Sequence, residues 1–163
     1  MSTPVTEPLR AEHRELLPHL ATLDQDVLAW ADRSAGQVAD ELGEMVAFLR
    51  GHLIPHARAE ELVLYPAVEE AMGAPGATAT MAADHREIVS RIDRFATTVE
   101  AVGPRWPEPA LVRDVARQLA GLSALIGHHF RKEEDVLLPV LDRSLSEEQA
   151  GELFSRMGQA AHH

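Results

Sequence analysis

The sequence predicts an all-α protein, an up-down-up-down four-helix bundle built from two similar halves and followed by a short fifth helix. Apolar residues recur every three or four positions through four long segments, and clusters of Gly and Pro separate these segments. The chain also repeats itself: HARAEELVLYPAVE at 56–69 matches HFRKEEDVLLPVLD at 129–142 in seven of fourteen positions. A repeat at a fixed offset identifies the structural unit. We therefore expect halves at about 6–72 and 80–142, related by a pseudo-two-fold axis.

Each predicted helix has its own signals. In chain order, the expected bounds are about 6–32, 34–72, 80–101, 110–142 and 146–158. Thr6 is placed to cap the first helix, and Ser146 with Gln149 three residues later forms a capping box for the last. On the second helix we expect Val63 to face the interior, and on the fourth its repeat equivalent Val136. Short connections between successive helices favour antiparallel neighbours, and hence a bundle.

Composition limits the function. At 163 residues we expect one domain, residues 1–163. The absence of cysteine excludes disulfides, thiolate zinc sites and cysteine-ligated iron–sulfur clusters. A net charge of −11 argues against nucleic acid or an anionic membrane as a partner. Neither a signal-peptide pattern nor an apolar run of roughly 20 residues is present, so we expect no membrane association and a cytoplasmic location.

Six polar side chains are predicted to meet inside the bundle. Two histidines interrupt apolar stripes within the related motifs EHRE (12–15) and DHRE (84–87), and each half also contains a His and a Glu four residues apart. Residues four apart share one face of a helix. Because neighbouring helices run antiparallel, the start of one lies level with the end of the next. The six residues are His13, His56, Glu60, His85, His129 and Glu133.

Four imidazoles and two carboxylates in a bundle interior point to a metal site, because burying them without a cation would cost several kcal/mol for each unpaired charge. Four nitrogens and four carboxylate oxygens supply two ions with four ligand atoms each. A bridging oxo or hydroxo group makes five, which leaves a six-coordinate ion one open position. This donor set suits iron, with manganese or zinc as lesser candidates. The lack of thiolates disfavours a closed structural zinc site.

These motifs resemble the hemerythrin-like (HHE cation-binding) domain family over about residues 9–142. The resemblance implies a four-helix bundle with a non-heme diiron centre held by the six residues named above. It implies activities such as oxygen binding or sensing, iron homeostasis, and reactions with peroxide or nitric oxide. The sequence departs from the oxygen-carrying hemerythrins at two positions. Val89 stands where they have a second histidine, and Glu133 follows His129 by four residues where they have an Asp after five.

Two residues near the predicted ligands have alternative roles. His52 lies four residues before His56 and has three alternatives: an additional ligand, a residue that supports the ligands, or a solvent-facing one. Tyr65 is expected to place its hydroxyl at the rim of the site, with a hydrogen bond to the metal centre or electron transfer as alternatives. Four further repeated residues fall off the ligand face and are expected in solvent: Arg58, Glu61, Arg131 and Glu134.

The functional hypothesis is a diiron protein that binds or reacts with a small oxidant, namely oxygen, peroxide or nitric oxide, at an open iron position. Catalase-like disproportionation of peroxide needs only the metal pair and access to it. Two alternatives stay open. One is an iron- or oxygen-responsive regulatory or iron-storage protein without turnover, and the other is a purely structural bundle.

Overall fold

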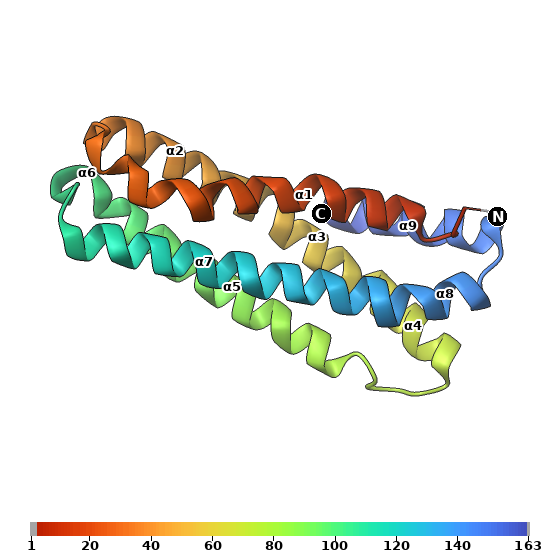
Figure 1. Ribbon diagram of the computed structural model, residues 1–163. Coiled ribbons are helices and arrows are strands. Elements are labelled where there is room, and N and C mark those ends of the chain that lie inside the picture. The colour runs from red at the N-terminus through yellow and green to blue at the C-terminus, as the bar shows by residue number, and fades with distance from the viewer. Residues whose placement is uncertain (1–2, 163) are drawn as a thin grey trace.

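The computed structural model describes residues 3–162, except for the side chains of residues 20–26, 28 and 31. The described regular structure is entirely helical, as predicted. The described helical segments form four long rods and a C-terminal helix. Figure 1 shows these rods lying side by side, with the C-terminal helix packed along one end of the bundle. No helix in the described part of the chain is both long enough and apolar enough to cross a membrane.

Each rod consists of consecutive helical segments. The first contains α1 (Glu7–Asp26) and the 3-10 helix η1 (Val27–Asp32). The second contains α2 (Ala35–Phe48), η2 (Leu49–Leu53), α3 (Ile54–Ala59), η3 (Glu60–Leu64) and α4 (Tyr65–Met72). The third contains α5 (Ala79–Glu100) and ends at the short α6 (Val102–Arg105). The fourth contains α7 (Pro109–Lys132), η4 (Glu133–Leu137) and α8 (Leu138–Ser144), and α9 (Glu147–Ala161) follows it. Segments η2, η3 and η4 are π-helical.

The helix ends follow local chemistry. The Ser146 hydroxyl accepts a hydrogen bond from the Gln149 backbone N–H, and the Gln149 side chain accepts from the Ser146 backbone N–H, so the predicted capping box is confirmed. Gly73 ends α4 with a φ of 62°, which glycine adopts without a steric penalty. Thr6 precedes α1, but its side chain does not cap the helix. Its hydroxyl instead donates to Asp142 Oδ1 at 2.8 Å, which joins the first rod to the end of the fourth.

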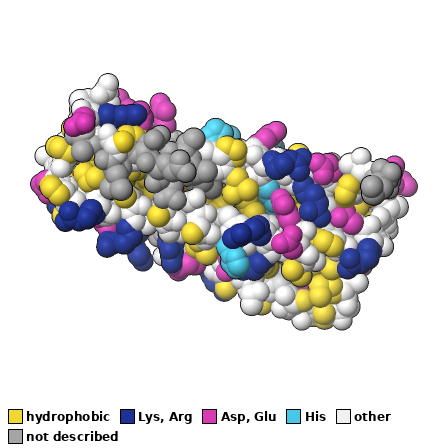
Figure 2. All heavy atoms as spheres, viewed as in Figure 1, with side chains coloured by type: hydrophobic (Ala, Val, Ile, Leu, Met, Phe, Trp, Pro, Cys, Tyr) yellow, Lys and Arg dark blue, Asp and Glu magenta, His cyan; other side chains and the backbone are white. Residues whose placement is uncertain are grey.

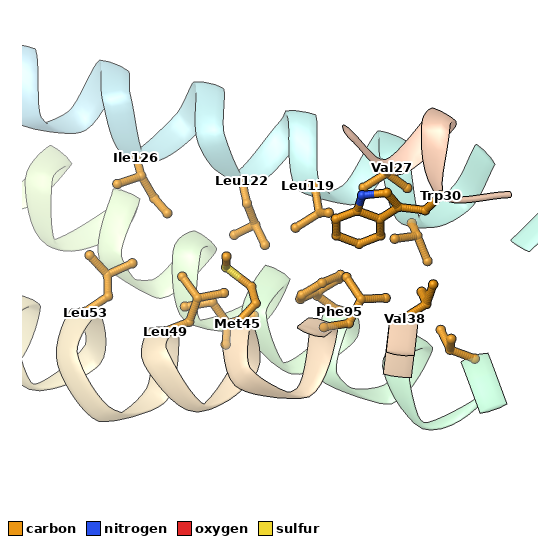
Figure 3. Packing of buried hydrophobic residues seen from close by; sticks show 14 of the residues in the cluster. Val27, Trp30, Val38, Met45, Leu49, Leu53, Phe95, Leu119, Leu122 and Ile126 are labelled. Atoms are coloured by element: carbon orange, nitrogen blue, oxygen red, sulfur yellow. The ribbon is translucent and has the colours of Figure 1, made fainter. Parts of the chain in front are cut away.

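The apolar core is divided into two clusters by a polar layer. Figure 3 shows part of the larger cluster, where Phe95, Leu49 and Leu122 pack between the rods. The smaller cluster lies around α4, α8 and α9. On α1, the buried His13 stands between Leu9 of the smaller cluster and Leu16 of the larger one. Both clusters bury large side chains completely, which fixes the rods that carry the polar layer.

The π-helical turns change which side chains face inward. Val136 was predicted to be buried, but it is 57% exposed. The wide turn of η4 directs Leu137 and Leu138 into the core instead. Its repeat equivalent Val63 is only 6% exposed and belongs to the apolar cluster that α9 completes. The two halves therefore differ, because α9 packs mainly against α3 and η3 of the first half.

Candidate metal centre

The structure brings all six predicted ligands into one buried layer. Each is at most 4% exposed. Their ligand atoms form two groups that share Glu60, and the atoms within each group lie within 4.8 Å of one another. One group consists of Glu60, His85, His129 and Glu133, and the other of His13, His56 and Glu60. Residues from all four rods thus meet at one level, as their spacing predicted.

The four imidazoles share one arrangement: Nε2 points toward the buried glutamates and Nδ1 faces a carboxylate on another rod. The pairs are His13 with Glu134 (3.1 Å), His56 with Glu12 (3.0 Å), His85 with Glu61 (2.8 Å) and His129 with Asp84 (3.2 Å). An ionised carboxylate only accepts hydrogen bonds, so Nδ1 carries the proton in a neutral ring. Nε2 is then left with a lone pair, which is the form that binds a metal ion.

These pairs include contacts that were not predicted. Glu61 and Glu134 were expected in solvent, and their side chains are 41% and 31% exposed, but each also binds the histidine of a neighbouring rod. Helical periodicity describes only the faces of a residue's own helix, whereas each of these carboxylates contacts a histidine on the neighbouring helix. The sequence analysis also missed Glu12 and Asp84 as partners. Their signal was present, because both repeated motifs place an acid directly before the histidine.

The two buried carboxylates each span both sets of histidines. Glu60 Oε1 lies 3.0 Å from His56 Nε2, while Glu60 Oε2 lies 3.3 Å from His85 Nε2. Glu133 Oε1 lies 3.3 Å from His129 Nε2, and its Oε2 lies 3.4 Å from His13 Nε2. Each glutamate therefore directs one oxygen to the His13/His56 side and the other to the His85/His129 side.

The hydrogen bonding of this layer is incomplete without a cation. Both Glu60 oxygens, Glu133 Oε2, and the Nε2 atoms of His13 and His56 are buried and lack a hydrogen-bond partner in the described structure. Unsatisfied buried carboxylate oxygens are costly. Imidazole nitrogens and carboxylate oxygens facing one another are instead the donor set of transition-metal sites. The residues present therefore fit a metal ion.

The electrostatics of the layer favour charge separation in the metal-free protein. Burial raises the pKa of Glu60, but His56, His13 and His85 outweigh it and hold that pKa well below its usual value. Burial lowers the pKa of His56, yet the neighbouring Glu60 and Glu12 raise it well above the usual value. A divalent cation would replace the proton on the imidazole as the balancing positive charge.

Tyr65 lies inside the site, so the expectation that its hydroxyl reaches the rim is wrong. The side chain is buried, and its hydroxyl donates to Glu133 Oε1 at 2.6 Å. The Tyr65 hydroxyl oxygen is also 3.2 Å from His85 Nε2 and 3.4 Å from His129 Nε2. Burial, reinforced by the carboxylates of Glu60 and Glu133, raises the pKa of Tyr65 well above its usual value, which keeps the phenol protonated in the metal-free protein. The repeat equivalent is Leu138, so this donor belongs to one side only.

Two other side chains complete the surroundings. His52 is exposed and lies against Phe48, with 5.3 Å between ring centroids, and it joins neither group of ligand atoms. Leu53, at the end of the π-helical η2, takes the inward position instead. Phe130 was missed by sequence reasoning. Its ring stacks on that of His13, with 4.0 Å between centroids and 4° between planes.

Comparison with known proteins agrees with this geometry. A protein-family model described as "Hemerythrin HHE cation binding domain" matches residues 5–141, which is most of the chain. The chain belongs to this hemerythrin family. Comparisons with curated proteins and with solved structures give no match. Family membership and the buried His/Glu cluster together indicate that this hemerythrin domain binds metal. Helix α9 follows the matched range.

Proposed function

We propose that the domain holds two iron ions and that it binds or reacts with a small oxidant, namely oxygen, peroxide or nitric oxide. The main support for this proposal is that the carboxylate oxygens are shared equally between the two pairs of histidines. Glu60 and Glu133 each direct one oxygen to each pair of histidines. Two ions would therefore each take two imidazole nitrogens and two carboxylate oxygens, with a bridging oxo or hydroxo group between them. Iron is favoured over manganese or zinc by the mixture of imidazole and carboxylate ligands with open positions.

Iron bound here would supply the electrons and the open coordination position at which the oxidant binds. The protein's own residues have other roles. The four Nδ1–carboxylate pairs fix the orientation of each imidazole and hold the proton away from Nε2. The Tyr65 hydroxyl holds Glu133 and keeps a proton beside the metal-binding atoms. Phe130 covers His13 with an apolar ring, which limits water at that side.

Metal analysis of the purified protein is the first test. We expect about two iron ions per chain and an absorption band from an oxo-bridged iron pair. Glu60→Gln should reduce the iron content strongly, because this residue serves both ion positions. Glu70→Gln, an exposed residue on α4, is the matched control and should keep the full content. Equal iron content in the two variants would contradict the ligand assignment.

Adding peroxide to the iron-loaded protein then separates turnover from binding alone. A catalase-like enzyme releases oxygen repeatedly, and Glu60→Gln should abolish this release. A regulatory or storage protein would release none, but it would become much more resistant to protease when iron binds, because a ligand specific to the folded state stabilises it. A protein without iron that shows neither response would be a structural bundle, and the proposal would be wrong.

A further inference from the structure

A second site, distinct from the metal layer, lies between α5 and α7. A hollow of about 190 Å³ is lined by Arg91, Arg94, Arg117 and Gln118. We name these four residues the basic hollow. Three of the chain's 15 basic residues meet here in a protein of net charge −11, and no carboxylate lines the hollow. Figure 2 shows Lys and Arg side chains at the lower left of the molecule, over the region of α5 and α7.

The internal repeat explains why there is space at this point. Gly121 occupies the position of Phe48 in the first half, and Arg91 occupies the position of His19. In the first half the aromatic rings of these two residues pack against each other, with 4.7 Å between centroids. In the second half glycine leaves room for the guanidinium of Arg91, whose Nη1 lies 3.0 Å from the place a Cβ of Gly121 would take. The second half thus has an arginine that lines the hollow where the first has two packed rings.

The arginines keep hydrogen-bonding capacity. Arg91 pairs with Glu87 through Nε at 2.7 Å, and Arg117 pairs with Asp114 through one terminal nitrogen. Arg94 makes no ion pair within the described residues and is exposed. The guanidinium of Arg94, unpaired among the described residues and beside two others that each use only part of their N–H groups on a carboxylate, attracts an anion.

Gln118 adds a polar group to the floor of the hollow. Its Nε2 donates to Thr98 Oγ1 at 2.8 Å and to Asp114 Oδ2 at 2.9 Å, which fixes the amide. Its Oε1 is buried and has no hydrogen-bond partner in the described structure. A buried carbonyl oxygen without a donor is unfavourable. A hydroxyl group of a ligand would satisfy it.

We propose that the basic hollow binds a small phosphate monoester that carries a hydroxyl group, such as a sugar phosphate. Guanidinium groups bind phosphate oxygens through paired, charge-assisted hydrogen bonds, and three of them surround this volume. Arg94 is the main contact because no carboxylate competes for it. Gln118 Oε1 accepts from the hydroxyl. The proposal does not depend on iron in the metal layer, so each can fail without the other.

Titration of the iron-loaded protein with ribose 5-phosphate, followed by backbone amide chemical shifts, tests this site. We expect saturable 1:1 binding with shifts concentrated on α5 and α7, and weaker binding of inorganic phosphate. Ribose alone should not bind. Arg94→Ala should weaken binding by about tenfold, the usual effect of losing one charge-assisted contact. Arg113→Ala, an exposed arginine on α7 outside the hollow, should leave the affinity unchanged.

Gly121→Phe gives an independent check, because it introduces the ring that the first half has at Phe48. It should abolish binding while helix content and iron content stay at the level of the unmodified protein. Vesicles of phosphatidylcholine with phosphatidic acid test whether the phosphate belongs to a lipid. Their retention of the protein, with no response to ribose 5-phosphate, would overturn the proposal. So would the absence of saturable binding, or equal affinities in Arg94→Ala and Arg113→Ala.

Discussion

Removing the carboxylate partner of a ligand histidine should weaken metal binding although the carboxylate itself does not bind the metal. Loss of such a partner typically costs 10- to 100-fold in metal affinity, which corresponds to about 1.4–2.7 kcal/mol. The exposure of each carboxylate predicts how large the loss of metal affinity is within this range. Water can replace an exposed partner more easily than a sheltered one, and the side-chain exposures are 23% for Asp84, 31% for Glu134, 41% for Glu61 and 52% for Glu12. We therefore expect Asp84→Ala near the hundredfold end and Glu12→Ala near the tenfold end.

Competition with a chelator of known affinity measures this effect for each variant, with Glu70→Ala as the exposed control. Glu61→Gln adds a further control, because the amide oxygen still accepts a hydrogen bond from His85 Nδ1 but carries no charge. It should lie between Glu61→Ala and the unmodified protein. The reasoning is refuted if all four alanine variants match Glu70→Ala, or if the order of their affinities is reversed.

Three further outcomes follow from the structure. Tyr65→Phe should lower the free energy of unfolding by about 1–3 kcal/mol in urea titrations, because it leaves a buried carboxylate oxygen without its donor. Val63→Asp should destabilise the protein strongly while Val136→Asp has little effect, since Val63 is buried in the apolar cluster that includes α9 residues and Val136 is 57% exposed; equal thermal shifts would contradict the assigned packing. In the metal-free protein, burial lowers the pKa of His56, but the carboxylates of Glu60 and Glu12 raise it well above its usual value overall. The protonated ring therefore stabilises the fold fully below about pH 6.5. This contribution should disappear as the pH rises through the folded-state pKa of His56. Urea titrations at several pH values, with and without iron, measure that loss, and a metal-free protein that becomes steadily more stable toward alkaline pH would disprove it.

The ligand layer was predictable from the sequence because it depends on spacing alone. His56 and Glu60 share a helix face by their four-residue separation, and an antiparallel bundle brings them level with His13. Helix periodicity and the breakers at Gly and Pro likewise gave the four rods. These features need no knowledge of how side chains pack between helices.

The residues that were misplaced depend on contacts between helices or on local changes of helical pitch. Glu61 and Glu134 could not be located by the helical periodicity of their own segments, because their partners lie on other rods. Val136 was misplaced because it lies within the π-helical turn η4, which changes the side chains that face inward and which no residue pattern in the sequence indicated. Tyr65 was placed at the rim for the same reason, since it begins α4 directly after the π-helical η3.

Some features of the site are present in both halves of the internal repeat, and others are present in one half only. The six predicted ligands and the four carboxylate partners obey the repeat, so the Nδ1–carboxylate pair of His13 has a counterpart at His85 and that of His56 has one at His129. The differences lie around this symmetric set. Tyr65 donates to Glu133, α9 packs against α3 and η3 of the first half, and the basic hollow lies between α5 and α7 of the second. If the layer holds two ions as proposed, a symmetric cage would treat both alike. The hydroxyl of Tyr65 lies on the His85/His129 side, so the two proposed ion positions would be chemically unequal, and a small oxidant would meet a proton donor at only one of them.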